Sequence, residues 1–429
     1  MLRSVGKAAL VATLVAASAC APGVEEREIE GREDLGLTIY PAKIENGLSG
    51  AIDIEVPEGT QSTLIEVRGD EGLYYLSKMT TPSSTELIES GLFVTRAARE
   101  LPGLVDWLYP NVPDRPVEAG TYTLILRAED PDGGHVGGED AKLWVYNKAA
   151  SSASGCGLSL DFLVDRDAVA EGDLDLLVDG LVARTLWFYN QVGVTITDYQ
   201  IQRVDLPGGG VDVSGQSWRT TLDSIDSVLD QARKEGSARA GSVHIVIVRS
   251  LGEGGPAGYS MGLPGPFGAD LPNSAVIISS LAYVDSDGFV DLDGLSTTLA
   301  HEMGHHLGLY HTSEENGLLH DPIDDTPECD EAFGCSQEFK ENIMTPGEGD
   351  KRWRFTPGQA EVIKRHPLCV AMDVAIPDKV CDATCTAPET CAIWEGQSTC
   401  LLACDPTAPE CPGAALCTTD AVGTYVCTP

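Results

Sequence analysis

Basic residues are scarce in this chain. Its 429 residues include 28 Lys and Arg against 66 Asp and Glu, which gives a formal net charge of -38 at pH 7. Nucleic acid and anionic membrane surfaces would both repel a chain of this charge, so we expect neither as a partner. The excess of carboxylates predicts a solvated acidic surface, which could also attract basic substrates.

Long apolar runs are also scarce, and the one at the N-terminus is too short to span a bilayer. It covers Ala8–Ala17, follows the basic residues Arg3 and Lys7, and ends in small residues. This order predicts a secretory signal over residues 1–19.

Cys20, which follows these small residues, predicts a lipid anchor. Ser18-Ala19-Cys20 looks like the end of a bacterial lipoprotein signal, so we expect Cys20 to begin the mature protein, followed by a tether over residues 20–37. The anchor would be the only membrane contact, and it would place the protein in the bacterial cell envelope, at the outer membrane. Ala17 stands where Leu is usual, so secretion into the medium stays open as the alternative.

The most informative motif is His301-Glu302-Met303-Gly304-His305-His306-Leu307-Gly308-Leu309-Tyr310-His311, which matches HExxHxxGxxH. On a helix, His301 and His305 project from one face because they are four residues apart. Gly308 can turn the chain back at little cost, so that His311 adds a third nitrogen. Three imidazoles with an open fourth position predict a catalytic zinc site, with Glu302 as a general base that is not a ligand.

The sequence after this motif resembles the pappalysin branch of the metzincins, the group that includes ulilysin. The resemblance is carried by the motif and by four short segments: Leu309–Thr312, Asp324–Pro327, Asn342–Pro346 and Phe355–Gln359. It implies an α/β metzincin catalytic domain over residues 156–372, with Met344 in the Met-turn below the zinc. Many relatives carry a Tyr two residues after this Met, but this chain has Pro346, which puts transition-state stabilisation by such a tyrosine in doubt.

Apolar patterns within residues 156–372 alternate between strand and helix types. Strands are predicted around Leu158–Phe162, Val194–Ile196, Val243–Val248 and Ser274–Ser280, helices around Leu174–Val182 and Leu222–Leu229, and a further helix from Thr356. We expect His244, within one of these strands, to be a core residue and not a ligand. By resemblance, the Gly- and Pro-rich segment Gly252–Pro266 would form the upper rim of a substrate cleft.

Two acidic segments in this part invite further hypotheses. The first segment lies where relatives bind calcium and contains Asp321, Asp324, Asp325 and Thr326. Its two alternative interpretations are a Ca²⁺ site and a solvated loop. By the same resemblance, Asp350, and after it Glu348, are candidates for a pocket that accepts a basic residue after the scissile bond. The alternative is that both acids face solvent on a Gly-rich loop.

The part before the motif predicts a β-sandwich-like domain over residues 38–148. Ile52-Asp53-Ile54-Glu55-Val56 alternates as a strand does, and Gly and Pro turns separate several such runs. The segment has no cysteine, so it cannot block a metal through a thiolate. Arg68-Gly69-Asp70-Glu71 could offer a carboxylate instead, although an exposed turn is the favoured interpretation.

Cysteines gather near the C-terminus, in a tandem repeat over residues 381–427. The first four are Cys381, Cys385, Cys391 and Cys400, and the second four are Cys404, Cys411, Cys417 and Cys427. No CxxC pair is present and the compartment is oxidising, so disulfides are favoured over zinc. Four further cysteines lie in the catalytic part. From their closeness in the chain and their place at the domain ends, our guess is that Cys329 pairs with Cys335 and Cys156 with Cys369.

The sequence thus predicts a multidomain, secreted or lipid-anchored zinc endopeptidase that acts on protein or peptide substrates. The alternative is a surface binding lipoprotein whose metzincin-like domain is inactive. Intact Glu302 speaks against this alternative, because the base or a ligand is usually lost first when an enzyme decays.

Overall fold

A computed structural model describes most of residues 23–374 and four short strands beyond them. The gaps are residues 71, 92, 96–97, 99–100, 114, 131–132, 135, 137, 207–217, 253–255, 269, 284–289, 315–318, 330–334 and 348–351. The described part consists mostly of β-sheet, with a few helices and two disulfides. None of its helices has the length and apolar character needed to cross a membrane.

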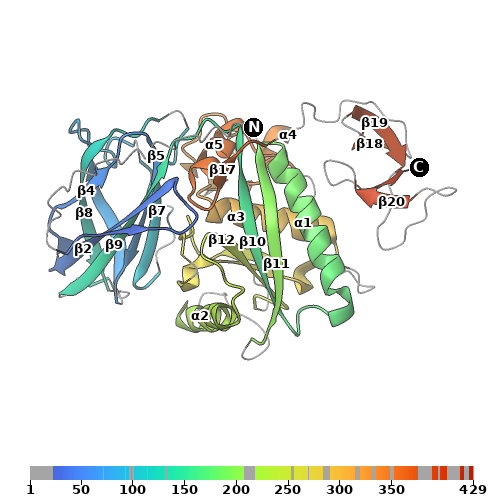
Figure 1. Cartoon of the computed structure of the whole chain (residues 1–429), viewed down its shortest axis with the longest axis horizontal. Coiled ribbons are helices and arrows are strands. Elements are labelled where there is room, and N and C mark those ends of the chain that lie inside the picture. Colours follow the sequence, from blue (N-terminus) through green and yellow to red (C-terminus); the bar gives the residue numbers. More distant parts are fainter. Residues whose placement is uncertain are drawn as a thin grey trace, which may run out of the picture.

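The N-terminal sheet contains nine strands, all paired antiparallel. They are β1 (Glu25–Glu28), β2 (Leu35–Glu45), β3 (Leu48–Ser49), β4 (Ile52–Val56), β5 (Thr60–Arg68), β6 (Leu73–Thr80), β7 (Leu104–Tyr109), β8 (Gly120–Glu129) and β9 (Glu139–Ala149). The sheet folds over one core, in which Ile54 and Leu124 from one end of the strand order pack with Ile65 and Val105 from the other. Figure 1 shows these strands as a compact group beside the remainder of the chain.

Strands β5, β7 and β9 contribute side chains to a core on each face. Because side chains alternate along a strand, Ile65 of β5 joins the core of the N-terminal sheet while its neighbour Leu64 joins the core of the adjoining part. Leu108 of β7 and Tyr146 of β9 also belong to that second core. Along these strands, the outer face of the N-terminal sheet is therefore covered by the part of the chain that follows it, whereas every second residue of β4 is exposed.

That following part is built on a six-stranded central sheet. Its strands are β10 (Gly155–Asp165), β11 (Val194–Val204), β12 (Ser242–Val248), β13 (Gly258–Ser260), β14 (Ala275–Ser279) and β17 (Val370–Met372). The order is β11-β10-β12-β14-β13, in which the first four strands are parallel. Strand β13 runs antiparallel at the edge next to β14, and β17 pairs antiparallel with the start of β10.

Helices cover both faces of the central sheet. Helices α1 (Leu174–Asn190), α3 (Leu292–His306) and α5 (Pro357–Arg365) share one core with the sheet, and α2 (Trp218–Glu235) packs in a second core on the other face. Figure 1 shows α2 on its own side, away from α1. The short helix α4 is Gln337–Glu341. Strands β15 (Ser313–Glu314) and β16 (Leu319–His320) follow the HExxHxxGxxH motif and pair with each other.

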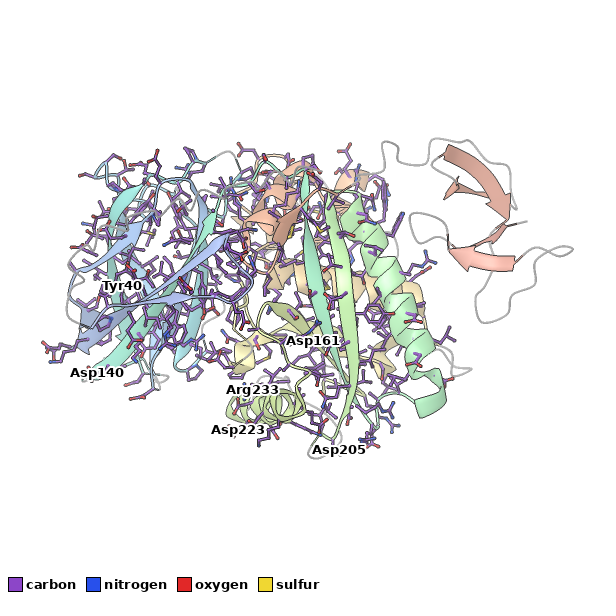
Figure 2. All side chains as sticks on the ribbon, viewed as in Figure 1. Tyr40, Asp140, Asp161, Asp205, Asp223 and Arg233 are labelled. Atoms are coloured by element: carbon purple, nitrogen blue, oxygen red, sulfur yellow. A yellow bond between two sulfur atoms is a disulfide. The ribbon has the colours of Figure 1, made fainter. Side chains whose placement is uncertain are left out.

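The sequence predicts these elements well. Strands occur at each predicted apolar run, and α5 begins with the predicted capping box, in which the Thr356 side chain accepts from Gln359 N and Gln359 bonds back to the cap. His244 is buried, with its ring nitrogens 3.2 Å from Ser274 O and 3.1 Å from Arg239 O, as expected for a core histidine. Asp161, labelled in Figure 2, holds Arg239 from the neighbouring strand β10.

The expected tether over residues 20–37 is corrected in part. Strand β1 lies within it and pairs with β2, for example Glu25 with Ile39, and β2 already begins at Leu35. All four side chains of β1 are exposed, so no apolar pattern marks it in the sequence. Backbone hydrogen bonds to β2 and the position of Arg27 over the Trp144 ring, 5.3 Å from its centroid, hold this polar edge strand.

The two disulfides join the cysteines that we paired from the sequence, Cys156 with Cys369 and Cys329 with Cys335. In the C-terminal repeats, strand β18 (Glu389–Trp394) pairs with β19 (Gln397–Leu402), and β20 (Leu416–Thr419) pairs with β21 (Tyr425–Thr428). Their register places Cys391 opposite Cys400 and Cys417 opposite Cys427. The last two cysteines of each repeat thus occupy equivalent places in a hairpin. The other repeat cysteines lie outside the described residues.

Candidate metal centre

Helix α3 carries two of the three predicted histidine ligands. Its N-terminus is capped by Asp291, whose side chain accepts from the backbone N–H groups of Asp293 and Gly294, both at 3.1 Å. One face of the helix packs on the central sheet through Leu295, Leu299 and Met303. His301 and His305 lie on the next face, only 7% and 5% exposed, so both rings are fixed by the helix and its surroundings.

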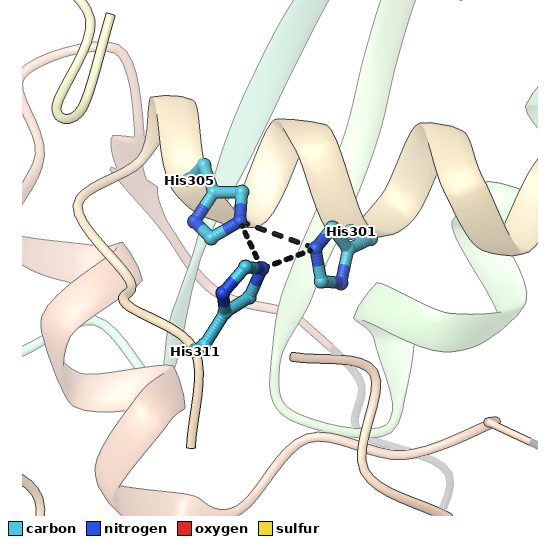
Figure 3. Close-up of side chains that lie close together, drawn as sticks. All are labelled: His301, His305 and His311. Atoms are coloured by element: carbon cyan, nitrogen blue, oxygen red, sulfur yellow. Dashed lines mark hydrogen bonds between the residues drawn. The ribbon is translucent and has the colours of Figure 1, made fainter. Parts of the chain in front are cut away.

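Gly308 makes the turn that brings in His311. Its φ of +99° is a conformation that disfavours any residue with a side chain, as the sequence predicts for this position. The backbone N–H of Leu309 then bonds to Gly304 O at 2.9 Å, which closes the end of the helix. The chain returns beneath α3 and presents His311 to the two helical histidines (Figure 3).

The Nε2 atoms of His301, His305 and His311 are each 3.1 Å from the other two. Each Nδ1 faces an oxygen: His301 faces Ile343 O at 2.7 Å, His305 faces Leu309 O at 2.7 Å, and His311 faces a Glu314 carboxylate oxygen at 2.5 Å. These oxygens accept, so each Nδ1 carries a proton, and in the neutral ring Nε2 then has the lone pair that a metal ion requires. Burial, and then the neighbouring His311 and Arg352, lower the pKa of His301 to about 3, which keeps its ring neutral.

Three converging lone pairs repel one another unless a cation lies between them. Nitrogens 3.1 Å apart can all lie about 2.0–2.1 Å from one ion placed to one side of their plane, which is the zinc–nitrogen bond length. The oxygen partners on Nδ1 are the usual outer contacts of metal-binding histidines. Among the described residues, His301, His305 and His311 form the one group of three or more His, Cys, Asp or Glu side chains that could hold a metal ion.

Glu302 follows His301 on the same helix and is partly exposed. The edge strand β13 passes close beside it, because a Cβ added to Gly258 would lie 2.8 Å from Glu302 Cγ and 2.5 Å from Thr298 Cγ2. Only a glycine allows this approach. The predicted upper rim therefore contains a short antiparallel edge strand that lies directly against Glu302.

Met344 lies below α3. It is fully buried, and a Cβ added to Gly304 would lie 2.4 Å from its sulfur, so the glycine between the two helical histidines makes room for it. The turn is held by Asn342, whose side-chain oxygen accepts from Met344 N at 2.8 Å and from Gln359 Nε2 at 3.1 Å. Met344 and its turn therefore support the helical segment that carries both histidines.

The acidic loop predicted as a candidate calcium site does not support one. One carboxylate oxygen of Asp321 accepts from Thr326 Oγ1 and Ile323 N, and both oxygens of Asp325 are used by Thr356 Oγ1 and Gly358 N at the start of α5. Asp324 is exposed. These oxygens hold the loop and cap a helix, which leaves too few of them facing a common point for Ca²⁺.

Other predicted residues are not brought to the metal centre. Arg68 pairs with Glu66 and Asp270, both at 2.8 Å, and its guanidinium lies 3.9 Å from the centroid of the Trp144 ring. Asp70 is exposed and Glu71 lies outside the described residues. Cys20 and the specificity candidates Asp350 and Glu348 also lie outside the described residues.

The sequence alone did not identify three contacts of the site. Glu314 orients His311, Gly258 places the edge strand, and Arg352 donates to Thr345 O at 2.9 Å while its NH1 lies 3.4 Å from His301 Nδ1. Glu314 could have been found, because an acid three residues after a metal-binding histidine can reach its Nδ1. The other two depend on contacts between distant segments, which no local pattern shows.

Several solved structures are similar to this chain. They include metalloproteinase-II from Bacteroides fragilis, promirolysin from Tannerella forsythia and archaemetzincin from Methanopyrus kandleri. The resemblance is to metzincin-type zinc proteases. Sequence identities to these metzincins are 14%, 16% and 17%, and the TM-scores are 0.30, 0.37 and 0.30.

The matches cover 52%, 50% and 51% of this chain, and 62%, 81% and 98% of those three chains. This chain thus covers less than two thirds of the length of the first structure, metalloproteinase-II. No family model matches the chain, and no curated protein sequence is similar to it. The metzincins are therefore only roughly placed as relatives, and the function rests on the residues of the site itself.

Proposed function

We propose that this chain is a zinc endopeptidase of metzincin type, which hydrolyses peptide bonds in proteins or peptides. The observation that carries the proposal is the convergence of three histidine Nε2 atoms, each 3.1 Å from the others, beside an acidic residue that follows the first of them. His301, His305 and His311 would hold Zn²⁺. When bound, the ion supplies Lewis acidity toward the scissile carbonyl and makes a bound water more acidic.

The residues of the chain supply the remaining steps. Glu302 takes a proton from the attacking water and returns it to the leaving amine, because its carboxylate follows the first ligand and is not itself one. The outer contacts of the histidines keep all three Nε2 atoms directed at one point. Strand β13 offers an extended substrate the edge of the central sheet beside Glu302, where backbone pairing would align the peptide.

The place of action is proposed from the N-terminus. A lipid on Cys20 would hold the protein at the bacterial cell envelope, and without it the protein would be secreted. The two disulfides fit an oxidising compartment of this kind. Substrates would then be extracellular or envelope proteins.

The test compares Glu302→Ala with the wild type. We expect the variant to bind one zinc per chain, measured by metal analysis, and its cleavage of a peptide library to fall by about 10²–10⁴-fold, which is the usual contribution of a general base. Asp293→Asn is the matched control, since it changes an exposed acid on the same helix and should keep both zinc and activity.

Two outcomes would contradict the proposal. Cleavage by Glu302→Ala at the wild-type rate would remove Glu302 from the mechanism. A wild-type protein that holds zinc but cleaves no member of the library would favour the rival, a surface binding lipoprotein with an inactive metzincin-like domain.

A further inference from the structure

The N-terminal sheet contacts the residue that precedes the third histidine. Tyr310 is buried at 8% exposure, and its hydroxyl donates to Val94 O at 2.9 Å. The same hydroxyl accepts from Asn111 Nδ2 at 3.1 Å, and Asn111, just after β7, is itself 4% exposed and also donates to Val94 O at 2.5 Å. This closed triangle of hydrogen bonds joins the end of β7 to the backbone next to His311.

The other end of the same turn also rests on β7. A Cβ added to Gly308 would lie 2.9 Å from Leu108 Cδ2, so the turning glycine packs directly on the last part of that strand. Leu108 is shared with the core around α3 and the central sheet. The segment from Gly308 to Tyr310 is therefore held at both ends by two side chains, Leu108 and Asn111, that lie three residues apart.

His311 depends on such support more than the other two histidines do. His301 and His305 are fixed by the hydrogen bonds of α3, whereas His311 lies outside any helix or strand. Its side chain is 24% exposed, and its Nδ1 partner Glu314 is 51% exposed. Thr312 N bonds to Met344 O at 3.2 Å on one side of His311, and the buried Tyr310 holds the other side.

We propose that Tyr310 and Asn111 are positioning residues for His311, so that the N-terminal sheet is a permanent part of the metal centre. The proposal rests on the zinc site of the proposed function. The N-terminal sheet restricts where the His311 backbone can lie, and this keeps the third nitrogen 3.1 Å from the other two. Loss of the Tyr310 hydroxyl would leave the ring in place but free the turn, and zinc would leave faster.

The experiment measures zinc release from the full chain in Tyr310→Phe, Asn111→Ala and their double variant. The zinc-loaded protein is mixed with an excess of a chromogenic chelator, and the rate of release is followed by absorbance without any peptide. We expect each single variant to release zinc about tenfold faster than the wild type, and the double variant to be no faster than either, because both changes break the same triangle.

Ser62→Ala is the matched control. Ser62 is buried on β5, and its hydroxyl donates to Arg365 O at 2.5 Å, so this variant also removes one hydroxyl that bridges the N-terminal sheet and the central part. Its bond leads to the end of α5 and not to a ligand. We expect it to lower the melting temperature of the metal-free protein as much as Tyr310→Phe does, while its zinc release stays at the wild-type rate.

Cobalt supplies an independent readout. The visible absorption of the Co²⁺-loaded protein reports the ligand arrangement, and we expect its bands to change in Tyr310→Phe and not in Ser62→Ala. Release rates and cobalt spectra in Tyr310→Phe equal to those of Ser62→Ala would overturn the positioning role and leave the zinc site standing. A wild-type protein that binds neither zinc nor cobalt would overturn both proposals.

Discussion

Replacing Lys148 by Met tests how strongly the N-terminal sheet is joined to the rest of the chain. Lys148 is 1% exposed near the end of β9, and its ammonium group donates to the backbone oxygens of Lys364 at the end of α5, His366 and Cys369. The last carbonyl groups of a helix have no partner within the helix, and here Lys148, 216 residues before Lys364, supplies a hydrogen-bond donor to one of them. Methionine keeps the length and apolar stem of the side chain but removes all three hydrogen bonds.

The magnitude follows from the three acceptors. His366 O also accepts from Cys369 N at 3.0 Å, so the main loss falls on the carbonyls of Lys364 and Cys369. Each buried acceptor that loses its partner costs roughly 1–2 kcal/mol, and the variant should lose about 3 kcal/mol of stability in total. For a protein of this size, this corresponds to a drop in melting temperature of roughly 3–4 °C.

The assay is thermal unfolding followed by circular dichroism, with Lys142→Met as the control. Lys142 is exposed on the same strand, so its change should shift the midpoint by less than about 2 °C. If Lys148→Met melted within about 2 °C of the wild type, the bonds to α5 would contribute little and the reasoning would be wrong.

The pH dependence of stability provides a second check on Lys148. Burial, and then the charge of Arg32, lower the pKa of Lys148 from 10.5 to about 7. Between pH 7 and 10.5 the unfolded chain therefore binds more protons at this site than the folded chain does, and stability rises with pH by up to about 1.4 kcal/mol per unit. This component of the rise should be absent from Lys148→Met, and an identical pH profile for both proteins would contradict the assignment.

Three further predictions concern other parts of the chain. Burial raises the pKa of Asp321 from 3.8 to about 7, so the stability that its protonated carboxyl group contributes is present below about pH 4 and is lost as the pH rises through 7. Asp321→Asn should remove this decline in stability from denaturation curves, and a pH profile equal to that of the wild type would refute the prediction. Cys20→Ser should move the protein from the membrane fraction to the soluble fraction, and a wild type that is already soluble would favour plain secretion. Mass measurement of the unreduced C-terminal repeats should show four bridges over residues 381–427, whereas stoichiometric zinc there would exclude the disulfide interpretation.

The histidines of the candidate metal centre could be brought together from the sequence because the main information is local. The spacing of His301 and His305 needs only the geometry of a helix, and the arrival of His311 needs only a glycine that can turn. Strands such as β12 were predictable for a similar reason, since its seven residues are all buried and mostly apolar. The Cys156–Cys369 pair was a guess from the place of both cysteines at the ends of the predicted catalytic domain, and the structure contains this bond.

The contact between the two sheets could not be predicted in this way. Alternation along β5 assigns Glu66 to solvent, yet it is fully buried and accepts from Phe267 N at 2.7 Å. Asp106, opposite Glu66 on β7, is buried as well and accepts from Asn273 Nδ2 at 2.5 Å. Arg68, which pairs with Glu66, is a local partner, but Phe267 and Asn273 lie more than 160 residues away from the acids that they bind. Only the folded chain therefore shows why both acids are inside.

The Cys156–Cys369 bond has a consequence for survival among proteases. It joins the second residue of β10 to the residue just before β17, and the chain between them, with a sequence separation of 213, contains all three histidines of the candidate metal centre. A single cut by a protease in any exposed loop of that span would leave two fragments that remain covalently joined. Because the buried strands on either side of such a cut would keep their neighbours, a nicked molecule could keep its shape, and its damage would become visible only on a reducing gel.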